Sequence, residues 1–117
     1  MQRQLVLDYL KSSVAQARLW IEACLDPEDD CPAFRDHARA ILRDAEKVLR
    51  MMNLFPEVVA AINEVHIATY ASTMHLANER LQDLTELLQA LEAEIALEEV
   101  SGDAASEAKA AATTTSP

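Results

Sequence analysis

This chain of 117 residues carries 20 acidic and 10 basic residues, a formal net charge of −10, and half of its residues are hydrophobic. It contains a single glycine and only 4% aromatic residues, which argues against turn-rich β architectures and glycine-rich phosphate-binding loops. The composition therefore favours one domain built from helices.

The negative charge is concentrated in the C-terminal half. Residues 56–117 hold eleven acidic and two basic residues, whereas residues 1–55 hold nine and eight. A strongly acidic helix repels a phosphate backbone, so nucleic-acid binding by this half is not expected. The charge is typical of a solvated surface or of a face that attracts a basic protein.

Two helices of about 20 residues are predicted in the N-terminal half. The first runs from about residue 5 to 25, and two prolines in the acidic stretch 26–32 then predict a loop. The second runs from about residue 33 to 52. Asn53 suits the left-handed residue that follows a helix end, and Pro56 suits the first turn of the next helix. The apolar stripe of the first helix comprises Leu7, Leu10, Val14, Ala17, Ile21 and Cys24.

The stretch 56–100 predicts one long third helix. After Pro56 it has neither glycine nor proline, and apolar residues recur in steps of three and four from Ile67 to Ile95. This spacing is typical of one continuous apolar seam. Such a helix would be about 65 Å long, roughly twice the length of either preceding helix. Residues 101–117 contain no large apolar side chain and are predicted to form a disordered tail.

The mismatch in helix length predicts an all-α, three-helix antiparallel arrangement in residues 1–100, with the long C-terminal helix forming a coiled-coil-like, dimeric bundle. Two short helices cover only half of the third, and each large apolar side chain left in water forgoes about 1.5–3 kcal/mol. The alternative is a break near residues 70–73 that folds the third helix back into a monomeric four-helix bundle; the unbroken spacing favours the continuous helix. The predicted interface, called here the C-terminal seam, comprises Leu81, Leu84, Leu87, Leu88, Leu91 and Ile95.

The residues with catalytic or metal-binding side chains do not form a known constellation. Cys24 and Cys31 lack the two-residue gap of redox and zinc pairs, and we interpret them as a core thiol and a loop thiol, with a disulfide as the alternative. His75 and Glu79 can share a helix face, but a metal site would need further ligands from another helix. We therefore expect no cofactor and no enzymatic activity.

Five basic residues recur along the second helix opposite its apolar stripe and are predicted to form an exposed basic ridge. Ridges of this kind bind phosphates, so a structural or nucleoprotein-associated helical module is the alternative function. Interspersed acidic residues and the lack of interleaved aromatic residues argue against nucleic acid. The ridge comprises Arg35, Arg39, Arg43, Lys47 and Arg50.

We expect a non-enzymatic regulatory or adaptor protein, such as an inhibitor, an antiactivator or a chaperone-like protein. It would bind a protein partner and form a homodimer through its long C-terminal helix. The N-terminal residues lack the apolar core of a signal peptide, and no apolar run reaches the ~18 residues that span a bilayer. A cytoplasmic protein without a membrane partner is therefore expected.

Overall fold

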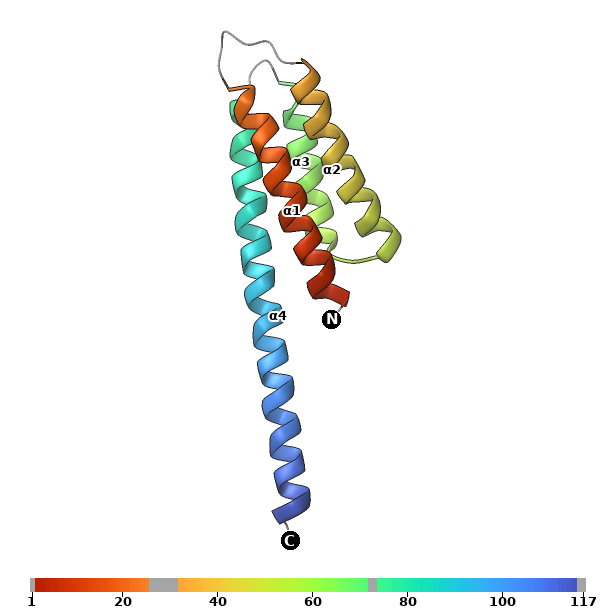
Figure 1. The fold of residues 1–117 in the computed structure, drawn as a ribbon, viewed down its shortest axis with the longest axis vertical. Helices are drawn as coiled ribbons and strands as arrows, with labels where there is room; N and C mark the ends of the chain where they lie inside the picture. Colours follow the sequence, from red (N-terminus) through yellow and green to blue (C-terminus); the bar gives the residue numbers. More distant parts are fainter. Residues whose placement is uncertain (1, 26–31, 72–73, 116–117) are drawn as a thin grey trace.

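The computed structural model is an antiparallel bundle of helices (Figure 1). It describes residues 2–25, 32–71 and 74–115, with side chains described as far as residue 98. Within these ranges the chain forms four helices and no strand: α1 (Gln2–Ala23), α2 (Pro32–Met52), α3 (Pro56–Ala68) and α4 (His75–Thr115). The acidic loop and Cys31 lie outside the described residues.

Each helix runs antiparallel to the next one along the chain, and the ring of four closes where α4 packs beside α1 (Figure 1). α1 contacts α2 and α4, and α3 contacts the same two helices from the other side. α4 continues well past the other three, which makes the molecule 73 Å long but only 25 by 17 Å across. The result is a short bundle with one projecting helix.

The core runs along the bundle axis and takes side chains from all four helices. In α1 and α2 the buried residues follow the three-and-four spacing of an amphipathic helix. At the end of the bundle that holds the α1–α2 connection, Trp20 of α1 packs against the rings of Phe34 and His37 of α2, with centroids 5.1 and 4.7 Å away. These ring contacts join the first two helices.

The turn between α2 and α3 has a strongly encoded geometry. Asn53 and Phe55 both adopt left-handed backbone conformations, with φ of 54° and 48°. The amides of Asn53 and Leu54 donate to the carbonyls of Arg50 and Leu49, the paired bonds of a Schellman helix end. Pro56 then begins α3. The predictions for Asn53 and Pro56 are confirmed.

The prediction of a continuous third helix, and with it the three-helix arrangement, is wrong. α3 ends at Ala68 and α4 begins at His75, so the chain adopts the four-helix alternative with a break near residues 70–73. The physical reason is that a fold-back lets α4 bury its apolar face against α1 and α3 of its own chain, where no association entropy is lost. A bond network around Arg39, described below, holds the turn.

α4 includes residues 101–115, for which the sequence predicts disorder. Six of these fifteen residues are alanine, the strongest helix former, so local propensity favours helix once α4 has started. This segment extends away from the rest of the bundle (Figure 1). Disorder of the tail in solution stays a prediction.

A separate observation concerns membranes: no helix in the described part of the chain combines the length and the apolar character needed to cross a bilayer.

Candidate functional site

The C-terminal seam is almost wholly buried inside the chain itself. Five of its six residues are at most 6% exposed, and Leu87 is partly buried and packs against the same core. The seam therefore faces α1 and α3 of its own chain, and in this arrangement it offers no surface to a second copy. The buried five are Leu81, Leu84, Leu88, Leu91 and Ile95.

Three contacts between side chains hold α4 alongside α1. Arg3 pairs with Glu98 at 2.6 Å, and Lys11 pairs with Glu92 at 2.9 Å. Near the other end of α1, Arg18 donates to the amide oxygen of Gln82. All three contacts are largely exposed, so each adds little stability, but together they fix the register of the two helices.

A mostly apolar cleft of about 410 Å³, called here the α1–α4 cleft, lies between these two helices on the outer surface. Leu19 stands on its wall with 68% of its surface exposed, so the cleft offers a large apolar side chain to a ligand. The sequence does not predict this site because Leu19 lies off the apolar stripe of α1, and a single off-stripe leucine carries little signal. The cleft is lined by Lys11, Val14, Ala15, Arg18, Leu19, Glu22, Thr85, Leu88 and Gln89.

A second cluster of exposed apolar side chains lies where α3 ends and α4 begins. Ile67 is 57% exposed, Tyr70 63% and Leu76 40%. These three line a common hollow together with Arg80 and Glu64. The bundle therefore has exposed apolar surface at the α3–α4 turn as well as in the α1–α4 cleft.

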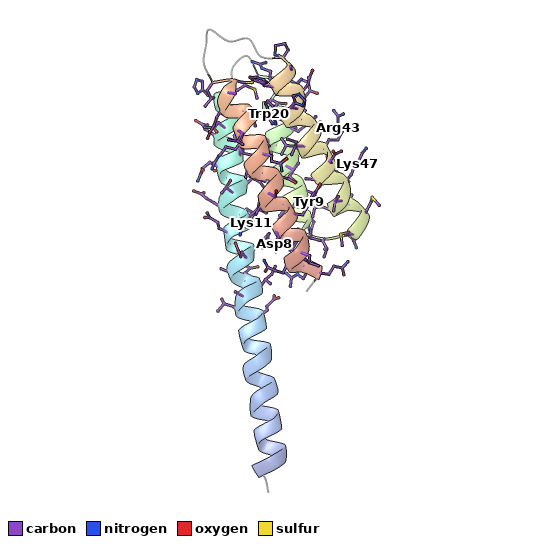
Figure 2. All side chains as sticks on the ribbon, viewed as in Figure 1. Asp8, Tyr9, Lys11, Trp20, Arg43 and Lys47 are labelled. Atoms are coloured by element: carbon purple, nitrogen blue, oxygen red, sulfur yellow. The ribbon has the colours of Figure 1, made fainter. Side chains whose placement is uncertain are left out.

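The predicted basic ridge on α2 is only partly available to a ligand. Arg43 and Lys47 are exposed on the outer side of α2 (Figure 2). Arg50 instead forms a salt bridge with Glu46 at 2.8 Å, and the side chain of Arg39 is only 17% exposed. Arg35 is partly buried, and its Nε has no hydrogen-bond partner in the described part of the chain. The five residues thus do not act as one surface.

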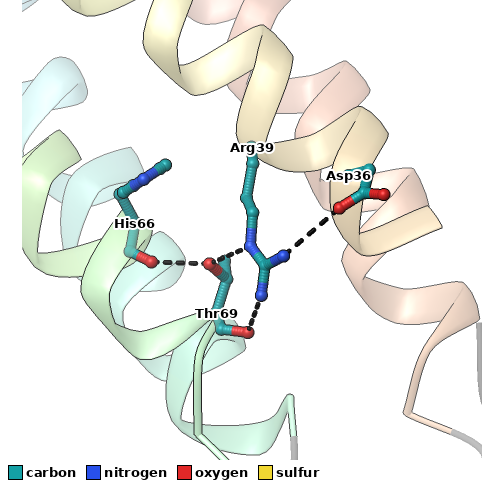
Figure 3. A network of polar contacts seen from close by, with 4 residues as sticks. All are labelled: Asp36, Arg39, His66 and Thr69. Carbon is teal, nitrogen blue, oxygen red and sulfur yellow. Dashed lines mark hydrogen bonds and ion pairs between the residues drawn. The ribbon is translucent and has the colours of Figure 1, made fainter. Parts of the chain in front are cut away.

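Arg39 is the centre of a network that we call the turn clamp (Figure 3). Its Nε donates to Thr69 Oγ1 at 2.9 Å, and its Nη2 donates to the backbone carbonyl of Thr69 at 2.8 Å. Its Nη1 pairs with Asp36 at 3.2 Å, and its guanidinium lies 3.9 Å from the centroid of the Tyr70 ring. The Thr69 hydroxyl in turn donates to the carbonyl of His66 at 2.5 Å. Arg39 thereby ties α2 to the C-terminal end of α3.

Burial and the charges around the turn clamp change the pKa of His66. Partial burial lowers the pKa of His66 below its usual 6.5, and the positive charges of Arg43 and Arg39 lower it further, while Glu46 acts in the opposite direction. His66 also meets Tyr70 edge-to-face, with ring centroids 5.6 Å apart. The folded structure therefore favours the neutral form of the His66 imidazole.

The other titratable candidates do not converge. In the described ranges no three His, Cys, Asp or Glu side chains come together in a group that could hold a metal ion. His37 stacks on Trp20, and both His75 and Glu79 are exposed on the first turns of α4. Cys24 is buried in the core, as its place on the α1 stripe predicts.

Comparison with models of protein families, with curated proteins and with solved structures gave no match for this chain.

Proposed function

We propose that this chain is a non-enzymatic regulatory or adaptor protein that binds an amphipathic helix of another protein in the α1–α4 cleft, and that it also associates with itself. The α1–α4 cleft is the observation that supports the proposal. Its walls are mainly apolar and include the exposed Leu19 and the buried Leu88. A groove between two antiparallel helices fits the apolar stripe of a third helix.

The net charge of the whole chain favours a basic partner helix. Lys11 and Arg18 on the α1 wall are already engaged by Glu92 and Gln82 of α4. Glu22 also lines the cleft, 3.8 Å from Arg18, and the chain as a whole carries a net charge of −10. Lys or Arg residues beside the apolar stripe of the partner would be attracted by the net negative charge of the chain, which would speed the encounter.

A nucleoprotein-associated role has weaker support. Arg39 is engaged in the turn clamp and Arg50 in a salt bridge within α2. Two of the five ridge residues are thus occupied, and the acidic α4 adds long-range repulsion of phosphate. We therefore do not propose nucleic acid as a ligand.

The test places a photo-reactive amino acid at Ala15, which lines the cleft. The crosslinked partner is identified from cells and binding is then measured with both proteins purified. Leu19→Asp should weaken binding on the order of tenfold or more, since it removes an apolar anchor and places a charge in the cleft. The matched control is Met51→Asp: Met51 is 86% exposed on α2 and does not line the cleft.

The proposal predicts that the control binds like the unmodified protein. Equal affinity of Leu19→Asp and the unmodified protein for the reconstituted partner would contradict the proposed site. So would a photo-reactive group at Met51 that captures the same partner with the same yield.

A further inference from the structure

The two hairpin turns of the bundle are encoded very differently. The α2–α3 turn combines two left-handed residues with a proline. The α3–α4 turn has no left-handed residue among those that the structure describes. Thr69, at φ −68° and ψ −11°, still has right-handed helical geometry, and the amides of Tyr70 and Ala71 donate three residues back, as in a tightened helix end. The backbone thus stays close to helical beyond the end of α3.

The side-chain pattern also crosses this turn without interruption. Residues 57–101 contain neither glycine nor proline, so no residue prevents a continuous helix there. The apolar steps run through Ile67, Tyr70, Met74 and Ala77. Met74 and Ala77, after the break, are buried. Ile67 and Tyr70, the two apolar residues just before the break, are 57% and 63% exposed. The fold-back therefore leaves these two apolar side chains exposed to solvent.

The turn clamp competes directly with a straight helix. In a continuous helix the carbonyl of Thr69 would accept a hydrogen bond from the amide four residues later. In the folded chain that carbonyl accepts from Arg39 Nη2 instead, and the Thr69 hydroxyl accepts from Arg39 Nε. One arginine of α2 therefore stabilises the bend that the local sequence does not encode.

We propose that α3 and α4 straighten into one helix and that two copies of this chain exchange α4. In the exchanged dimer, the two long helices run antiparallel and cross at the former turn. α4 of one copy then occupies the same place against α1 and α3 of the other, because α3 and α4 are antiparallel neighbours in the single chain as well. The core contacts of α4 and the pairs Arg3–Glu98 and Lys11–Glu92 form again between copies.

Several free-energy contributions decide between the folded-back monomer and the exchanged dimer. Straightening adds helical hydrogen bonds at the turn and brings Ile67 and Tyr70 of both copies to the crossing point, where they can be covered. Straightening and exchange lose the bonds of the turn clamp and the translational and rotational entropy of two separate chains. Each copy carries a net charge of −10, so repulsion opposes pairing and added salt favours it. The inference deepens the self-association part of the proposed function and does not depend on the α1–α4 cleft.

The test measures mass and helix geometry together. Spin labels are attached to introduced p-acetylphenylalanine at Glu57 and Glu94, both exposed, and the labelled chain is diluted in unlabelled chain. The fold-back holds α3 antiparallel to α4 and so gives a short distance, whereas a straight helix separates the two positions by about 55 Å. Arg39→Met should raise the dimer fraction in sedimentation and shift the distance distribution to the long value in the same samples.

Two further variants sharpen the test. Arg50→Met is the matched control, since the side chain of Arg50 bonds to Glu46 of its own helix and not to the α3–α4 turn in the described part of the chain; it should leave mass and distance as in the unmodified protein. Ala71→Gly added to Arg39→Met should lower the dimer association constant on the order of 25-fold, because glycine disfavours the straight helix about fivefold in each of the two chains.

The outcomes separate this inference from the proposed function. An Arg39→Met protein that stays monomeric with the short distance overturns the exchange, and so does a dimer that keeps the short distance. If Arg39→Met does not fold, the unmodified protein annealed at high concentration and high salt replaces it, with the same two criteria. Binding of a partner helix in the α1–α4 cleft is tested by Leu19→Asp and is unaffected by either result.

Discussion

The placement of the C-terminal seam within the chain makes a quantitative prediction for Leu84. This side chain is 0% exposed, so Leu84→Ala leaves a cavity that the neighbouring helices fill only in part. Such substitutions typically cost 2–5 kcal/mol, and about 3 kcal/mol is expected here. In a domain of this size that loss lowers the melting temperature by more than about 10 °C. Leu97→Ala is the control: it makes the same change on the same helix at a side chain that is 67% exposed, and should cost less than about 0.5 kcal/mol.

The assay is urea unfolding followed by circular dichroism at 2 and 20 µM protein. We expect the folded-back single chain to predominate over the exchanged dimer at these low concentrations. Burial within one chain then predicts a midpoint that does not depend on concentration, and a large difference between Leu84→Ala and Leu97→Ala. Similar stability of the two variants would refute the reasoning, since it would mean that Leu84 is not in a packed core. A midpoint that rises with concentration for the unmodified protein would show that a second copy completes the seam.

Two further predictions concern the turns. Because the pKa of His66 is lowered in the folded chain, the unfolded chain binds the proton more tightly; the resulting stability is present above pH 6.5 and is lost as pH falls below it. His66→Gln should reduce this loss in urea unfolding between pH 7.5 and 5.5, and Arg43→Gln should raise the pKa of His66 in an NMR titration; a steeper loss in His66→Gln would contradict the assignment. Asn53→Ala should cost about 1 kcal/mol because residue 53 is left-handed, whereas Asn53→Gly should cost nothing; equal losses would show that the backbone conformation is not the cause.

Much of the first half of the fold is predictable because its signals are local. The loop prolines and the left-handed Asn53 followed by Pro56 act within a few residues of where they stand, and the observed helices match the predicted ranges to within about three residues at each end. The apolar stripe of α1 is buried as predicted, from Leu7 to Cys24. Local stereochemistry decides these features, so tertiary contacts do not override them.

The α3–α4 break is not predictable from the same signals because a distant residue stabilises it. Arg39 and Thr69 are 30 residues apart in the chain, and nothing in the sequence marks them as partners. The spacing of Arg39 matches that of Arg43 and Lys47, which predicts a place on the basic ridge. Spacing places a residue on a helix but does not show what covers it, and the neighbouring end of α3 covers Arg39. The α1–α4 cleft is not predictable from the sequence for a related reason: it exists only once α4 has folded back.

The three-and-four spacing of the C-terminal seam reports that one face of the helix is buried, but it holds no information about which chain buries it. A helix that folds back and a helix that pairs with another copy need the same apolar residues at the same positions. The choice between them rests on the cost of bending at residues 69–74 against the cost of bringing two chains together. At the α2–α3 turn, the left-handed residues and Pro56 make a bend favourable and a continuous helix unfavourable. At the α3–α4 turn, the bonds of Arg39 to Thr69 favour the bend, so we predict that a change at that one side chain alters which chain completes the bundle.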